Sequence, residues 1–282
     1  MSTAHLLHYD LLSLAGRGTF AEVWQVRDRR TGRMHALKQL RAEWVDRPAT
    51  RQILKNEAEV GHKVSSDHVA RIGGADLDAT TPYVLVEWLS GGTLESHLPA
   101  GQRLECREAL WVARQCAQGM HALLIAGYTH GDIKPSNIFV CQDGTVKLID
   151  LGFARPDQLP NTELSCSGYG VLTGTPEYLA PESLVAGNPG GISRDVYSLG
   201  ITLYRMLTGV LPFQGESIAD ILKQHQEALP ARLRCLAPEV PREVNDFVHR
   251  LLAKQPLRRG GGLSWLIHEL LGLELLLLPG SA

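Results

Sequence analysis

The opening part of the chain alternates short apolar runs with one helical stretch. Between residues 47 and 64, Ile53, Leu54, Ala58 and Val60 recur with Lys and Glu between them, a spacing typical of an amphipathic helix. Around this stretch, β-prone runs bounded by turn residues predict strands at Leu11–Ala15, Ala21–Arg27, His35–Leu40 and Tyr83–Trp88. We therefore expect a β-rich unit that contains one long helix.

The pattern changes after the breaker Ser90-Gly91-Gly92. Leu94–Leu98 and Glu105–Ala126 show helical periodicity, and helical segments separated by Pro and Gly dominate from Arg194 onward. This predicts an α+β chain with a small lobe at about residues 9–86, a hinge at about 87–91 and a larger, mainly helical lobe at about 92–276. Because no repeat or low-complexity tract interrupts it, residues 1–282 are expected to form one domain.

Composition narrows the class of protein. The 282 residues are 44% hydrophobic and 21% charged, which is ordinary for a globular protein with a sizeable core. A formal net charge of −2 argues against a nucleic-acid partner, which usually requires a basic excess. Five cysteines without CxxC spacing predict reduced thiols, a cytoplasmic location and no structural zinc.

The ends of the chain show neither a signal peptide nor a membrane span. The N-terminus lacks a basic start followed by a long apolar run. The apolar stretch Leu263–Leu278 is interrupted by His268, Glu269 and Glu274, and it falls short of the roughly 20 apolar residues that a bilayer span requires. We expect a packed terminal helix there.

A glycine-rich turn lies between the first two predicted strands, in the run from Leu14 to Val23. Glycines such as Gly16 and Gly18 let backbone N–H groups approach phosphate oxygens, because no Cβ intervenes. Taken alone, the turn is more often a plain hairpin. It does not fit a dinucleotide-binding fingerprint, because Ala21 replaces the third glycine and a strand follows instead of a helix.

Lys38 lies inside the apolar strand His35–Leu40. Such a lysine can extend its ammonium group outward to water. If it is buried, it requires an anion, and the predicted helix offers Glu57 on one face and Glu59 on another. A nucleotide phosphate would be the second partner.

The segment from His130 to Ile138 is the strongest chemical signal. An acid, a base and an amide within six positions of a proline-containing loop make a poor core segment. Asp132 could accept a hydroxyl proton, Lys134 could neutralise charge on a phosphoryl group, and the amide oxygen of Asn137 could bind Mg²⁺.

A second carboxylate follows shortly afterwards. Val146–Ile149 reads as a strand that ends at Asp150-Leu151-Gly152. Together with Asn137, Asp150 would form an oxygen-ligand Mg²⁺ site, and two protein ligands are enough because Mg²⁺ keeps water and substrate phosphates in its shell.

Taken together and in this order, these motifs resemble the eukaryotic-type protein kinase family. The likeness continues through Gly174–Glu182, which reads GTPEYLAPE, through Asp195–Gly200, which reads DVYSLG, and to Arg259, the match of the arginine that pairs with the APE glutamate Glu182. It covers about residues 9 to 272. The resemblance implies a two-lobe fold with a small antiparallel N-lobe, and a serine/threonine protein kinase that uses ATP with Mg²⁺ or Mn²⁺ on protein substrates.

The resemblance also implies roles for individual residues. Asp132 is the catalytic base, Lys134 the charge neutraliser, Asn137 and Asp150 the metal ligands, and Thr175 the hydrogen-bond partner of Asp132 and Lys134. The implied nucleotide site comprises Leu14, Gly16, Gly18 and Val23 over ATP, Ala36, Val86 and Phe139 around the adenine, Glu87 and Leu89 at the hinge, and Lys38, paired with Glu57, on the phosphates.

Three positions depart from the family pattern. Gly131 replaces the arginine of HRD, Leu151 replaces the phenylalanine of DFG, and Gly61 replaces an apolar side chain behind the Lys–Glu pair. Without the HRD arginine, we expect that phosphorylation of the activation segment does not switch catalysis; its candidate acceptors are Thr162, Ser165, Ser167 and Thr173. Gly61 predicts a gap that leaves the Glu57 helix loosely held, so that a regulatory protein would support it.

Two other readings stay open on the sequence. Small-molecule phosphotransferases also carry an HGD loop, but they usually lack a lysine at the offset of Lys134 and the GTPEYLAPE segment. A non-catalytic scaffold is the second, although Lys38, Asp132, Asn137 and Asp150 are all present.

Overall fold

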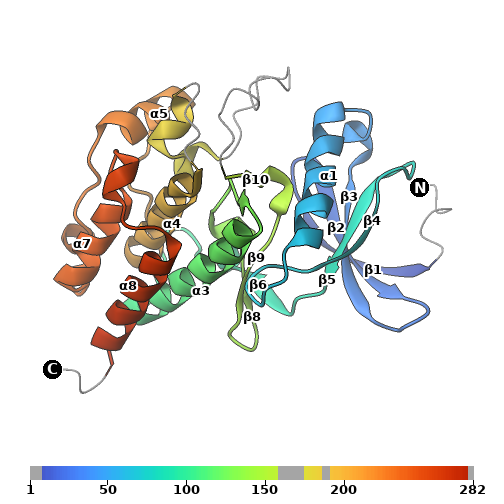
Figure 1. Ribbon diagram of the computed structural model, residues 1–282, viewed down its shortest axis with the longest axis horizontal. Helices are drawn as coiled ribbons and strands as arrows, with labels where there is room; N and C mark the ends of the chain where they lie inside the picture. The colour runs from blue at the N-terminus through green and yellow to red at the C-terminus, as the bar shows by residue number, and fades with distance from the viewer. Residues whose placement is uncertain (1–7, 158–174, 186–190, 279–282) are drawn as a thin grey trace.

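The computed structural model describes residues 8–157, 175–185 and 191–278. It shows two lobes, a small one built on an antiparallel sheet and a larger helical one (Figure 1). The predicted α+β two-lobe architecture is confirmed.

The small lobe is a five-stranded antiparallel sheet in the order β1-β2-β3-β5-β4. Its strands are β1 (Tyr9–Arg17), β2 (Ala21–Asp28), β3 (Met34–Leu40), β4 (Ile72–Asp76) and β5 (Tyr83–Glu87). Alternation along β3 and β5 gives the sheet two apolar faces: Leu37 and Leu85 pack on one side, and Leu40 and Val84 on the other.

Helix α1 (Pro48–Lys63) covers the second of these faces. Leu54 and Ala58 of α1 are buried against Leu40, Ile72 and Val84 of the sheet. The outward stripe of the helix is polar, as the amphipathic spacing predicted. The helix is therefore fixed to the sheet by its own apolar face.

A second sheet, in the order β6-β8-β9, begins directly after the hinge. It comprises β6 (Gly91–Thr93), β8 (Ile138–Cys141) and β9 (Val146–Leu148), while β7 (Tyr128–Thr129) pairs with β10 (Arg155–Pro156). These short strands frame the segments 130–137 and 149–154. The two loops singled out by sequence are thus held side by side.

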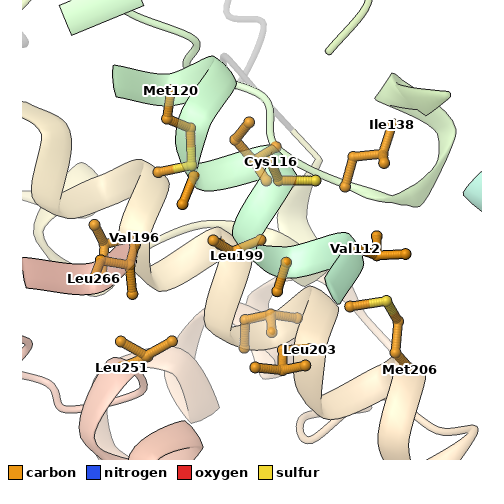
Figure 2. Packing of buried hydrophobic residues seen from close by; sticks show 14 of the residues in the cluster. Val112, Cys116, Met120, Ile138, Val196, Leu199, Leu203, Met206, Leu251 and Leu266 are labelled. Atoms are coloured by element: carbon orange, nitrogen blue, oxygen red, sulfur yellow. The ribbon is translucent and has the colours of Figure 1, made fainter. Parts of the chain in front are cut away.

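The large lobe is built around α3 and α4, which lie in the middle of its helices (Figure 1). Figure 2 shows their contact, where Cys116 and Met120 of α3 approach Leu199 of α4. The helices are α2 (Leu94–His97), α3 (Cys106–Ile125), α4 (Gly191–Thr208), α5 (Ile218–Glu227), α6 (Leu233–Leu236), α7 (Arg242–Leu251) and α8 (Leu263–Leu276). Short 3-10 turns lie at η2 (Ala42–Trp44), η3 (Pro135–Asn137), η4 (Leu151–Phe153), η6 (Pro176–Tyr178), η7 (Pro181–Leu184) and η8 (Pro256–Arg258).

The leucine-rich end forms the packed helix that was predicted. In α8, Leu266 and Leu270 are fully buried against the large-lobe core, and Glu274 receives two hydrogen bonds from Arg114 of α3, at 2.6 and 3.1 Å. Over the described residues, every helix is too short or too polar to cross a bilayer.

Four of the five cysteines lie in the described part of the chain. Cys106, Cys116, Cys141 and Cys235 are free thiols, and Cys166 lies outside the described residues. No group of three or more acidic, histidine or cysteine side chains gathers as a metal site within those residues.

Candidate active site

Lys38 is buried and binds two carboxylates at once. Its Nζ lies 2.7 Å from Oε2 of Glu57 and 2.8 Å from Oδ1 of Asp150, and the residue is 9% exposed. The alternative partner Glu59 instead lies on the exposed side of α1, 3.7 Å from Lys55. The pairing with Glu57 is therefore confirmed, and the ammonium group does not reach out to water.

One cation between the buried carboxylate of Glu57 and the partly exposed carboxylate of Asp150 leaves this triad one negative charge in excess. Burial raises the pKa of Glu57 to about 7, because the opposing effect of Lys38 is shared with Asp150. Burial alone would lower the pKa of Lys38, but Asp150 and Glu57 outweigh it and raise that pKa. Burial likewise opposes ionisation of Asp150, yet Lys38 holds its pKa below the ordinary value.

The glycine-rich turn joins β1 to β2, and β2 pairs with β3, the strand that carries Lys38. Gly16 pairs with Val23 across the two strands, and the N–H of Gly18 donates to the carbonyl of Ala21 at 2.8 Å. The described part of the chain brings no heavy atom within 4 Å of a Cβ built on Gly16. Leu14, at 46% exposure, lies on the same strand.

Two contacts fix the position of this turn. The Arg41 guanidinium donates to the carbonyls of Gly18 and Thr19 at 3.1 and 2.9 Å. Phe20 meets Phe153 edge to face, with ring centroids 6.5 Å apart. The turn is thereby linked to the segment that carries Asp150.

Asp132 lies at the centre of a hydrogen-bonded cluster. Lys134 Nζ is 2.7 Å from its Oδ2, and the amide nitrogen of Asn137 donates to the same oxygen at 2.9 Å. The hydroxyl of Thr175 donates to Oδ1 at 3.2 Å, while Lys134 also donates to that hydroxyl at 2.6 Å. All four residues proposed from sequence meet here.

The backbone of this loop is anchored from α4. The carboxylate of Asp195 accepts from the N–H groups of His130 and Gly131 at 2.6 and 2.9 Å. Nδ1 of His130 accepts from the N–H of Asp132 at 3.3 Å, which leaves Nε2 as the donor to the carbonyl of Ile149 at 3.1 Å. A buried histidine thus joins the two loops.

Asn137 and Asp150 are linked through the backbone. The N–H of Ile149, next to Asp150, donates to the carbonyl of Asn137 at 3.0 Å. Because the amide nitrogen of Asn137 is turned to Asp132, its Oδ1 lies on the other side of the amide group. A carboxylate and an amide oxygen are hard donors, so the pair fits Mg²⁺ completed by water and phosphates.

The residues expected around the adenine lie along the hinge side. Ala36 of β3 and Val86 of β5 are cross-strand neighbours, and Phe139 is a half-buried residue of β8. The N–H of Glu87 donates to the carbonyl of Arg71, and its carboxylate receives Nζ of Lys147 at 2.9 Å. Leu89 follows, half-buried, in the hinge.

Comparison with known proteins shows the family to which the chain belongs. Residues 9–271 match the protein kinase domain. The chain belongs to the protein kinase domain family. Relatives of this kinase domain are named as serine/threonine-protein kinases.

Three relatives illustrate the similarity. The kinase domain is 30% identical over 252 residues to a probable serine/threonine-protein kinase of Streptomyces coelicolor, covering 88% of this chain and 37% of the relative. PknA of Mycobacterium tuberculosis is 30% identical over 257 residues, covering 89% and 58% respectively. The human kinase MRCK gamma is 30% identical over 265 residues, covering 90% and 16%. The chain thus spans between 16% and 58% of these relatives' lengths.

One prediction about the kinase domain is wrong. Gly61 leaves no gap behind the Lys38–Glu57 pair, because Cγ1 of Ile72 lies 2.0 Å from where a Cβ on Gly61 would be. The β4 side chain occupies the space that the family pattern gives to the helix residue, so glycine is needed there for close packing. Leu151, the second departure, is a buried core residue at 2% exposure.

The backbone conformation at position 131 explains why glycine replaces the arginine there. Its φ is +79°, and a Cβ would lie 2.4 Å from the carbonyl oxygen of Phe153. Glycine adopts this conformation without the steric cost that other residues incur. The four hydroxyl residues at 162, 165, 167 and 173 lie outside the described residues, so the expectation that their phosphorylation does not switch catalysis stays a prediction.

Several contributors to the site were missed from sequence. They act through contacts with segments that are distant in the sequence. Arg41 donates to the glycine-rich turn, Lys147 pairs with the carboxylate of Glu87 at the hinge, and Asn56 donates to the turn after Asp150. Only Asn56 carried a signal, since it directly precedes Glu57 on the predicted helix.

Proposed function

We propose that this domain transfers the γ-phosphate of ATP to a serine or threonine hydroxyl of a protein. The observation that carries the proposal is the meeting of two clusters, Asp132 with Lys134, Asn137 and Thr175, and Lys38 with Glu57 and Asp150. His130 and the Ile149 backbone connect them. Phosphoryl transfer depends mostly on positioning and electrostatics, which such a connected set supplies.

At the acceptor side, Asp132 is the proposed base. It orients the substrate hydroxyl and accepts its proton as the oxygen forms its bond to phosphorus and the bond to the β-phosphate oxygen breaks. Lys134 neutralises charge on the moving phosphoryl group. Thr175, bonded to both side chains, holds them in register and begins the segment on which the protein substrate docks.

At the nucleotide side, Lys38 is proposed to bind the α- and β-phosphates, with Glu57 fixing its ammonium group. The backbone around Gly16 and Gly18 would cover the phosphates. The carbonyl of Glu87 and the N–H of Leu89 would bind the adenine edge, between apolar side chains of Leu14, Val23, Ala36, Val86 and Phe139.

Asn137 and Asp150 are the proposed metal ligands. A bound Mg²⁺, or Mn²⁺, neutralises phosphate charge during transfer. Lys38 contacts Oδ1 of Asp150 at 2.8 Å, and we expect its ammonium group to shift toward the phosphates when a nucleotide binds.

The whole protein's activity, substrates and partners are likewise proposals, because the chain spans only part of its relatives. We propose a cytoplasmic location, in keeping with the four free thiols among the described cysteines. A regulatory partner at α1 would contact the exposed polar residues of its later turns, which include Lys55, Glu59 and His62. It would not fill a gap at Gly61.

The direct test is γ-phosphate transfer from labelled ATP to an array of serine and threonine peptides, with aminoglycosides and choline as competing acceptors. We expect labelled peptides, and Asp132→Asn should remain folded while activity falls by about a thousandfold. Transfer to the small alcohols alone would show a small-molecule kinase. Nucleotide binding without any transfer would show a scaffold.

A further inference from the structure

Helix α1 touches the turn that carries Asp150 along a continuous seam. At one end, Gly152 packs so closely against α1 that a Cβ on it would lie 2.5 Å from Cγ2 of Ile53. At the other end, Glu57 reaches Asp150 through Lys38. Asn56 lies between these two contacts, one turn of helix after Ile53.

The side chain of Asn56 is committed to this turn. Its Nδ2 donates to the carbonyl oxygens of Leu151 at 3.3 Å, Gly152 at 3.0 Å and Ala154 at 2.6 Å. Carbonyl oxygens only accept hydrogen bonds, so the convergence of three of them identifies the facing atom as the amide nitrogen. A carboxylate at this position would be repelled by all three.

The backbone at the start of this turn has an unfavourable conformation that a restraint would stabilise. Asp150 has φ +64°, the one positive φ outside glycine among the described residues. A non-glycine residue in this region is strained and persists only where its surroundings hold it. Lys38 holds the Asp150 side chain, but that bond does not constrain the backbone that follows.

We propose that Asn56 is a positioning residue: it holds the backbone of residues 151–154 in the form that keeps the Asp150 carboxylate aimed at Lys38 and the metal, and it does so from the helix that carries Glu57. The proposal rests on the proposed role of Asp150 as a metal ligand. In this proposal, a residue of α1 itself stabilises the active arrangement of the domain, whereas the sequence suggested that a regulatory protein would do so.

The chemistry of the Asn56 amide yields an ordered series of variants. Asn56→Leu removes the donor but keeps the approximate size. Asn56→Asp replaces the donor by an acceptor charge, and Asn56→Gln keeps a donor on a longer arm. We expect activity in the order parent, Gln, Leu, Asp. Gln52→Ala, an exposed change on the same helix, is the matched control.

The experiment measures peptide phosphorylation as a function of Mg²⁺ at fixed, saturating ATP, beside Asp150→Asn. For Asn56→Leu we expect kcat to fall by about tenfold and the half-saturating Mg²⁺ concentration to rise several-fold, while the KM for peptide stays within about twofold. Loss of packing alone would lower the melting temperature without moving the metal dependence. Gln52→Ala should match the parent.

The outcomes separate this inference from the proposed function. If Asp150→Asn shifts the Mg²⁺ dependence and Asn56→Leu does not, Asn56 has no positioning role. If Asp150→Asn itself leaves the metal dependence unchanged, the metal-ligand assignment fails instead. Should Asn56→Leu not fold, the pair Asn56→Gln and Asn56→Asp decides, because equal metal dependence in those two would equally overturn the inference.

Discussion

At the scale of single residues, the Lys38 triad sets one ammonium group against two carboxylates. Two carboxylates compete for one ammonium group in a buried site, so one of them must be easy to protonate. The pKa values divide that role clearly: that of Asp150 is lowered and that of Glu57 is raised to about 7. The pair therefore links folding to pH near neutrality.

The first prediction concerns Glu57→Gln. The pKa of Glu57 rises from 4.5 to about 7 on folding, so between those values the folded state binds a proton that the unfolded state has lost, and stability falls as pH rises. The stability of the variant relative to the parent should therefore increase as pH rises. Urea midpoints of the two ligand-free proteins at pH 5, 6, 7 and 8 measure this difference. A constant difference would contradict the raised pKa.

The comparison with the variant is necessary because a second residue titrates with the opposite sign. Burial lowers the pKa of His225 from 6.5 to about 4. The unfolded state therefore binds the extra proton in that range, and stability rises with pH there. The parent curve alone mixes both effects, whereas the difference between parent and Glu57→Gln isolates the carboxyl group.

The main residues of the candidate site could be predicted from the sequence. The segment from His130 to Asp150 combines acidic, basic and amide side chains, which a segment of the hydrophobic core would not contain. The choice between Glu57 and Glu59 could not be made from spacing alone, since both lie on one helix and either face could turn inward. The apolar face of α1, which buries Leu54 and Ala58, decides it.

At the scale of elements, one arginine of α4 contacts the segment that begins at Thr175, which is the proposed substrate-docking segment. The guanidinium of Arg205 donates to the hydroxyl of Tyr178 at 2.9 Å and forms a two-bond pair with Glu95 of α2 at 2.8 Å. Tyr178 is buried and lies three residues after Thr175. This links α2, α4 and the docking segment.

We predict that Arg205→Met weakens peptide binding rather than nucleotide binding. The KM for peptide should rise by about fivefold, with the KM for ATP unchanged, because the lost bonds join the docking segment to α2 and do not involve the residues of the proposed nucleotide site. Tyr178→Phe should produce a smaller effect in the same direction. Arg205→Lys serves as the control for charge, since lysine lacks the two-pronged fork that Glu95 needs for a bidentate pair.

A rise in the KM for ATP with an unchanged KM for peptide would contradict this assignment. That result would indicate that Arg205, Glu95 and Tyr178 do not take part in docking the substrate and only stabilise the large lobe.

Elements with clear periodicity could be predicted from sequence, and those without it could not. The long helices α1 and α3 follow the apolar spacing within a residue or two. Strand β4 was missed because Gly73 and Gly74 break its pattern, and it forms only because β5 offers a partner edge. The gap expected at Gly61 was wrong for the same reason, since Ile72 of this strand fills it.

At the scale of the whole molecule, one buried ion pair joins the docking segment to the end of the large lobe. Arg259 and Glu182 are 2% and 4% exposed, and their two hydrogen bonds measure 2.5 and 2.7 Å. The guanidinium also donates to the carbonyls of Ala253 and Ser193, both at 2.8 Å, and lies over the ring of Tyr197. The sequence resemblance predicted this pairing, but it could not show how deeply it is buried.

The last prediction follows from that burial. Arg259→Met leaves the Glu182 carboxylate buried without its cation, so it should lower the free energy of unfolding by about 3–5 kcal/mol. Arg259→Met combined with Glu182→Gln should cost less than the sum of the single changes, because neither charge is then left alone. Urea unfolding of the four proteins gives the coupling energy. The exposed pair of Arg250 and Glu269, 3.8 Å apart, is the control, and Arg250→Ala should cost under about 1 kcal/mol. Additive losses at Arg259 and Glu182 would show that the two side chains act separately, as packing groups rather than as an ion pair.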